Sequence, residues 1–218
     1  MNKNRFSPDT HVFLWDLHEV ILTKSLWQWL MAFVRFNRKW ELVRRLDRRT
    51  VRIMITFAAE TLKLTKKQMV SEELLIAAQQ AHNTALIELV ELVCSAYAPI
   101  KKTVLLMKEL SRLGYKHHLG SNIGQTIFAH SAEKFSDIFT SFEVCSIPFM
   151  QDARIIKKPD PHFFMSHAQK AHVKPEHIIF VDDKLANVMA AQSVGMQAIH
   201  FKSPKQLKKQ LIAWGILS

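Results

Sequence analysis

Side chains that could do chemistry occur in four short, widely separated stretches of this chain. In chain order they are Asp16, the pair Ser121 and Asn122, Lys158 within Lys-Pro-Asp-Pro, and the pair Asp182 and Asp183. Hydroxyl and ammonium groups can bind the oxygens of a tetrahedral anion, while carboxylates supply the hard oxygens that hold a divalent cation beside it. The pattern therefore predicts a phosphate-handling site assembled from distant segments.

Short apolar runs precede most of these polar residues and predict buried strands. The expected strands cover residues 12–15, 115–120, 178–181 and 197–201. Helical patterns separate them, over residues 101–113, 126–134, 161–171, 185–194 and 204–214. Alternating strands and helices predict an α/β fold with a parallel sheet covered on both faces. Ligands bind such sheets at the carboxyl ends of the strands, which is where the polar residues are expected to meet.

Residues 23–97 break this alternation and predict an inserted helical unit. Apolar residues recur there at spacings of three and four, and the stretch contains no glycine. The expected helices cover residues 26–34, 40–57, 66–81 and 84–96. The predicted domain organisation is a core of residues 1–22 and 98–218 with an all-helical insertion of residues 23–97.

Composition predicts a soluble globular protein with an affinity for anions. Apolar residues make up 48% of the 218 residues, and no apolar run reaches the roughly 18 residues needed to span a membrane. No secretory signal is recognisable, and the two cysteines, Cys94 and Cys145, suit a reducing compartment, so a cytoplasmic location is expected. The net charge of +11 comes largely from basic residues between positions 24 and 67. Nonspecific nucleic-acid binding could follow from this charge, although no nucleic-acid motif is present.

Two groups of histidines are not expected to form metal sites. His162, His167, His172 and His177 recur every five residues, which turns each by about 140° from the last along a helix and denies them a common face. His117 and His118 are neighbours on an expected strand, so their side chains should point to opposite faces of the sheet.

The four stretches, taken in order, resemble the motifs of the haloacid dehalogenase-like hydrolases. The matching segments are residues 13–21, residues 120–122, residues 158–161 and residues 180–183, the last with Asn187 and Gly195. The resemblance implies a Rossmann-like α/β core, and it identifies the insertion as similar to the family's helical cap. The acid pair at the fourth motif resembles that of sugar-phosphate phosphatases and of phosphatase domains fused to epoxide hydrolases.

The resemblance also implies a role for each residue in a Mg²⁺-dependent phosphomonoesterase acting on a small phosphorylated metabolite. An aspartate can attack phosphorus to give an acyl phosphate that water hydrolyses, which divides one difficult step into two. The implied roles are Asp16 as nucleophile, His18 as general acid/base, Ser121, Asn122 and Lys158 as phosphate-binding residues, and Asp16, the His18 backbone carbonyl, Asp182 and Asp183 as Mg²⁺ ligands.

His18 departs from the family pattern, because most family phosphatases have a second aspartate at this position. Histidine can donate a proton to a leaving alkoxide and accept one from water, since its ordinary pKa of about 6.5 is close to working pH. Two alternatives stay open. The chain could bind phosphate, a partner or nucleic acid without turnover, or it could be a haloacid dehalogenase, whose aspartate nucleophile needs no cation.

Overall fold

The computed structural model describes residues 6–24, 97–152 and 154–218. The chain divides into two compact units, one of Met1–Thr23, Pro99–Asn122 and Ala132–Ser218, the other of Lys24–Ala98 and Ile123–Ser131. The expected helices between positions 26 and 96, and most of the basic stretch, lie outside the described residues. The predicted helical insertion and its boundaries therefore stay a prediction.

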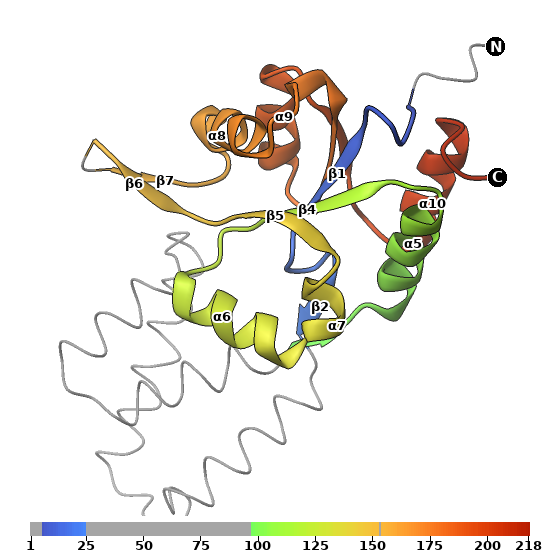
Figure 1. Cartoon of the computed structure of the whole chain (residues 1–218), viewed down its shortest axis with the longest axis horizontal. Helices are drawn as coiled ribbons and strands as arrows, with labels where there is room; N and C mark the ends of the chain where they lie inside the picture. The colour runs from blue at the N-terminus through green and yellow to red at the C-terminus, as the bar shows by residue number, and fades with distance from the viewer. Residues whose placement is uncertain (1–5, 25–96, 153) are drawn as a thin grey trace, which may run out of the picture. The chain divides into compact units, whose positions relative to one another are not determined.

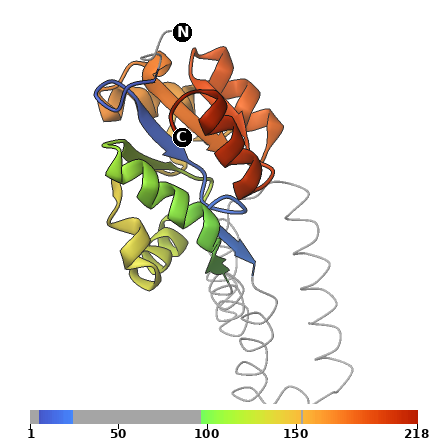
Figure 2. The same ribbon diagram turned by 90° about the vertical axis from the view of Figure 1, so that its right-hand side faces the viewer.

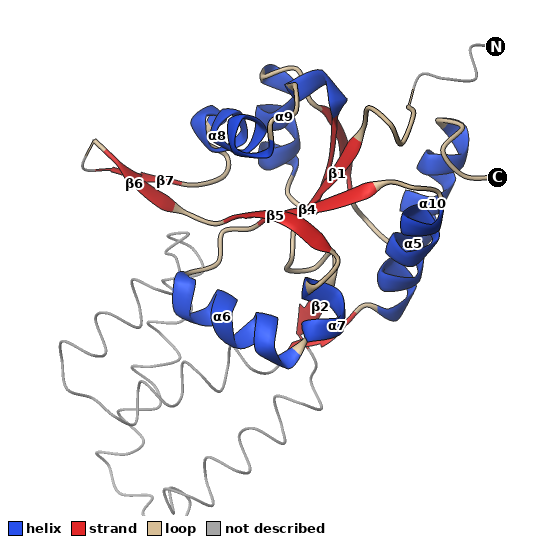
Figure 3. Cartoon of the chain, viewed as in Figure 1, coloured by secondary structure: helices blue, strands red, loops and turns tan. Residues whose placement is uncertain are grey.

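A parallel five-stranded sheet, in the order β5-β4-β1-β8-β9, forms the centre of the first unit (Figures 1 and 3). Its strands are β1 Val12–Trp15, β4 Lys116–Gly120, β5 Phe142–Ser146, β8 Ile178–Asp182 and β9 Gln197–His200. The chain builds outward from β1 to β4 and β5, then returns to place β8 and β9 on the other side of β1. In sheets of this kind, ligands bind at the carboxyl ends of the strands beside such a reversal. The expected α/β, Rossmann-like fold is confirmed.

Helices cover both faces of this sheet. Helices α8 (Pro161–Ala171) and α9 (Leu185–Ser193) pack on one face, and α5 (Lys101–Arg112) and α10 (Pro204–Ala213) pack together on the other. Figure 2 shows the green α5 and the orange helices on opposite sides of the blue strand β1. Leu14, Phe164 and Phe180 belong to the buried cluster beneath α8 and α9. Apolar side chains on both faces explain why these strands are nearly continuous apolar runs.

Local sequence sets the start of two of the core helices. The Asp160 carboxylate accepts a hydrogen bond from the His162 backbone N–H (2.9 Å) at the N-terminus of α8. Ser203 caps α10 in the same way, and a proline occupies the first turn of each helix. Proline fits there because the first-turn N–H groups have no partner within the helix.

The remaining described elements are short. They are β2 (Leu22–Lys24) paired with β3 (Tyr97–Pro99), the antiparallel pair β6 (Phe149–Gln151) and β7 (Arg154–Ile156), α6 (Gln125–Lys134), α7 (Ser136–Phe139) and a 3₁₀ turn at Pro175–His177. Across the described ranges, no helix combines the length and apolar character needed to cross a membrane.

Candidate active site

The sheet brings three of the predicted residues to one edge. Asp16 directly follows β1, and its backbone N–H donates to the Val181 carbonyl of β8 (2.9 Å). Asp182 is the last residue of β8, and Ser121 directly follows β4 on the other side of β1. At the end of β4, a Cβ atom added to Gly120 would lie 3.0 Å from Leu14 Cδ1. A side chain at position 120 would press against Leu14, so the packing here favours glycine.

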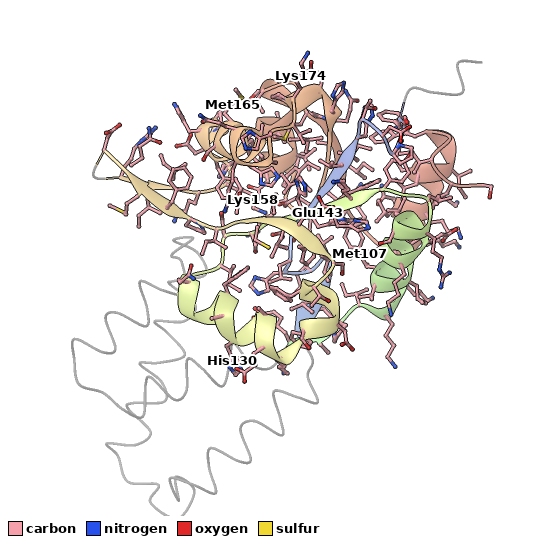
Figure 4. All side chains as sticks on the ribbon, in the orientation of Figure 1. Met107, His130, Glu143, Lys158, Met165 and Lys174 are labelled. Carbon is pink, nitrogen blue, oxygen red and sulfur yellow. The ribbon has the colours of Figure 1, made fainter. Side chains whose placement is uncertain are left out.

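Lys158 joins two of the acids from the loop between β7 and α8. Its side chain is 1% exposed, and its Nζ donates to Asp16 Oδ1 (2.8 Å) and to Asp182 Oδ2 (2.6 Å). Figure 4 labels this side chain in the core. Burial alone would lower the pKa of the Lys158 ammonium, but the charges and hydrogen bonds of the two carboxylates outweigh burial and raise it. Lys158 is therefore a fixed positive charge beside Asp16.

Asn122 holds the backbone of Lys158 instead of pointing a free amide at the site. Its Nδ2 donates to the Lys158 carbonyl (2.7 Å), and its Oδ1 accepts from the Lys158 N–H (2.9 Å). The side chain thus pairs with a backbone unit 36 residues away, as a neighbouring strand would. This pair fixes the loop that presents the ammonium group.

The two acids of β8 have different surroundings. Asp182 accepts hydrogen bonds from the Lys184 N–H (2.8 Å) and from Asn187 Nδ2 (3.0 and 2.9 Å), in addition to Lys158. Burial raises the pKa of Asp182 while the Lys158 charge opposes this. Asp183 Oδ1 is buried and has no hydrogen-bond partner among the described residues. Burial, followed by the charges of Asp16 and Asp182, raises the pKa of Asp183 to about 6.

The residues fit a divalent cation. Carboxylate oxygens of Asp16, Asp182 and Asp183 all lie within 4.8 Å of one another, and they are hard oxygen ligands of the kind that Mg²⁺ takes. Three carboxylates facing one ammonium group leave an excess of negative charge in a buried place. A bound cation would relieve the repulsion that raises the pKa of Asp183.

Ser121 and His18 complete the set of predicted residues. Ser121 is 1% exposed, and its Oγ has no hydrogen-bond partner in the described part of the chain, so the hydroxyl can bind an added anion. His18 is half-buried in the tight turn after Asp16, where the Leu22 N–H donates to the Leu17 carbonyl (2.8 Å).

Sequence reasoning anticipated the acids and Lys158, and it missed two supporting contacts. Asn187, noted only as part of the fourth motif, binds both oxygens of Asp182. His200 Nε2 donates to the Asp183 carbonyl (3.0 Å) from the end of β9. No sequence pattern marks His200, because its partner is set by the pairing of β9 with β8. The catalytic and binding roles of all these residues stay a proposal.

Comparisons with known proteins give the family and the relatives that this chain resembles. The family model of the haloacid dehalogenase-like hydrolases matches residues 10–195. A sesquiterpene phosphatase of Aspergillus oryzae is 31% identical over 104 residues, which is 47% of this chain and 50% of that protein. A flavin mononucleotide hydrolase of Arabidopsis thaliana is 37% identical over 60 residues, 28% of this chain and 24% of that protein. The chain thus matches half or less of the length of these curated relatives.

The fold also recurs in solved structures. An enzyme of the same family from Bacteroides thetaiotaomicron, in complex with magnesium and inorganic phosphate, is similar with a TM-score of 0.54 and 18% sequence identity. The match covers 88% of this chain and 94% of that one. At this identity the likeness shows the fold alone.

Proposed function

The chain belongs to the haloacid dehalogenase-like hydrolases, and we propose that it is a Mg²⁺-dependent phosphomonoesterase that acts on a small phosphorylated metabolite. The observation that carries the proposal is the buried Lys158 ammonium, which binds Asp16 and Asp182 at once. A nucleophilic carboxylate held beside a fixed positive charge suits attack on a phosphate anion, because the positive charge offsets the repulsion between the two anions.

The proposed reaction has two steps and an aspartyl-phosphate intermediate. An Asp16 carboxylate oxygen attacks phosphorus, the bond from phosphorus to the ester oxygen breaks, and that oxygen takes a proton from His18. Water then attacks phosphorus, gives its proton to His18, and releases inorganic phosphate and the free Asp16 carboxylate. Lys158 and the Ser121 hydroxyl bind the non-reacting oxygens in both steps. Asn122 acts through Lys158, whose backbone it holds.

The three acids differ in how free their oxygens are to hold Mg²⁺. When bound, the cation would neutralise negative charge on the phosphate and on the carboxylates. Asp183 has an unpartnered buried oxygen, whereas both oxygens of Asp182 already accept hydrogen bonds. Asp183 is therefore the acid most open to a cation. Asp16, Asp182 and the backbone carbonyl of His18 are the other proposed ligands.

Two alternatives are less well supported. A haloacid dehalogenase would use the same nucleophile without a cation, and the repulsion among Asp16, Asp182 and Asp183 would then have no bound cation to relieve it. The similarity to proteins named as a phosphatase and as a flavin mononucleotide hydrolase also supports a phosphate ester. The second alternative, binding without turnover, depends on whether His18 can transfer protons.

Variants of His18 test the proposed function. p-Nitrophenolate leaves without a proton, whereas an alkoxide needs one, so His18→Ala should lower kcat/KM, which reports the step that forms the intermediate, about a hundredfold more on an alkyl phosphate than on p-nitrophenyl phosphate. His18→Asp should keep both activities. Equal loss on both substrates would refute the role in acid catalysis, and unchanged rates in both variants would show that the histidine has no chemical role.

A further inference from the structure

Three buried or half-buried polar side chains form a connected set, which we name the histidine bridge: Ser146, His167 and His118. His118 Nδ1 lies 3.1 Å from His167 Nε2, and His167 Nδ1 lies 2.8 Å from Ser146 Oγ. These residues belong to three different elements, β5, α8 and β4. The bridge therefore ties the helix to two adjacent strands.

Both imidazoles of the bridge are neutral at pH 7. Two ring nitrogens 3.1 Å apart can share a hydrogen bond only if one of them carries a proton and the other does not. Burial lowers the pKa of His118 to about 4 and the pKa of His167 to about 3, so both rings are neutral at pH 7. Neutral rings let His118 Nδ1, His167 Nε2, His167 Nδ1 and Ser146 Oγ each take part in a hydrogen bond within the bridge.

Both ends of the bridge lead to groups that the proposed function assigns to phosphate. The Ser146 carbonyl accepts a hydrogen bond from the Ser121 N–H (3.0 Å), and His118 lies three residues before Ser121 on β4. His167 lies on α8, the helix that begins directly after the Lys158 loop. The bridge thus connects the serine hydroxyl and the lysine ammonium through their supporting elements.

Burying polar side chains here costs desolvation free energy. Well-packed apolar side chains of similar volume would avoid their desolvation, whereas a hydrogen-bonded set fixes one geometry. We propose that the histidine bridge positions Ser121 relative to Lys158, so that both reach the same phosphate group. Ser146, His167 and His118 are positioning residues in this proposal, which rests on the proposed function.

The test measures the dissociation constant of inorganic phosphate by calorimetry, with Mg²⁺ present throughout. Ser146→Ala removes one hydroxyl and should weaken phosphate binding about tenfold, the loss expected when one hydrogen bond to a charged group is misaligned. Ser146→Thr keeps the hydroxyl and should restore binding. Because Ser146 acts through Ser121, adding Ser146→Ala to Ser121→Ala should cause little further loss.

Ser111→Ala is the matched control. The Ser111 hydroxyl binds His117 Nε2 (2.9 Å), and His117 Nδ1 accepts from Trp15 Nε1 (3.0 Å), so this serine supports the neighbouring histidine on the opposite face of β4. The variant should change stability to a similar degree and leave phosphate affinity within about twofold.

The possible outcomes separate the inference from the proposed function. Suppose that the wild-type protein binds phosphate and hydrolyses a phosphate ester. Unchanged phosphate affinity in Ser146→Ala, or fully additive losses of affinity in the double variant, would then overturn the inference alone. A wild-type protein that neither binds phosphate nor hydrolyses any phosphate ester would overturn the proposed function, and the inference with it.

Discussion

Replacing Lys158 with methionine should destabilise the fold strongly, and the structure gives the size of the effect. The ammonium lies 2.8 Å from Asp16 and 2.6 Å from Asp182, with 1% of the side chain exposed. At an effective dielectric constant of about 20, each contact is worth about 6 kcal/mol before desolvation. Removing one partner of a buried ion pair costs about 3–5 kcal/mol net, and we expect that loss in the free energy of unfolding near neutral pH.

The loss should depend on pH in a defined direction. Without the ammonium, the three neighbouring carboxylates repel one another, and this repulsion is relieved as they take up protons. The difference between Lys158→Met and wild type should therefore shrink as the pH falls from about 7.5 to about 5. Urea denaturation measured without added cation gives both values.

Lys174→Met provides the control, because it makes the same chemical change at an exposed lysine. It should alter the free energy of unfolding by no more than about 0.5 kcal/mol. A loss below about 1 kcal/mol in Lys158→Met would contradict the reasoning, because buried pairs broken on one side lose several times more. A difference from wild type that stays constant with pH would contradict it as well.

Three further predictions concern the supports of the site. Asn122→Ala should lower kcat on p-nitrophenyl phosphate about tenfold to a hundredfold with little change in KM, because the Lys158 loop loses its fixed position; an unchanged kcat would show that the loop holds itself. Mg²⁺ at 100 times its dissociation constant should stabilise wild type by about 2.7 kcal/mol, and Asp183→Asn should lose most of this gain in thermal unfolding; an equal gain would remove Asp183 from the metal site. Burial lowers the pKa of His118 to about 4 and that of His167 to about 3, so the contribution of each neutral ring to the free energy of unfolding is full above about pH 6.5 and falls at lower pH by up to about 1.4 kcal/mol per pH unit. The slope of the free energy of unfolding against pH should therefore be shallower in His167→Gln than in wild type. An identical slope would refute the lowered pKa of His167.

The central strands and most core helices could be predicted from the sequence because their patterns are local. Strand β1 and helix α8 begin and end at the expected residues, since one is a four-residue apolar run and the other starts at an Asp-Pro cap. Strand β5 was not expected. It lies at the edge of the sheet and is mostly half-buried, so Phe142–Ser146 lacks the continuous apolar run of the central strands.

The site shows the same limit. The acids and Lys158 could be predicted because each follows a strand or lies in a recognisable motif, and they do converge. The pairing of Asn122 with the Lys158 backbone depends on how two loops meet in space. Likewise, alternation along the strand correctly placed His117 and His118 on opposite faces, but nothing in the sequence indicates that His167 is a partner.

Phosphate release by wild type and by Asp16→Asn, measured side by side on a panel of phosphate monoesters with and without Mg²⁺, tests the central claim most directly. The account predicts release by wild type on at least one ester, dependent on Mg²⁺, and a loss of at least about a thousandfold in the variant, because an amide cannot replace the attacking carboxylate. Equal release by the two proteins, or none by wild type across the panel, would contradict it.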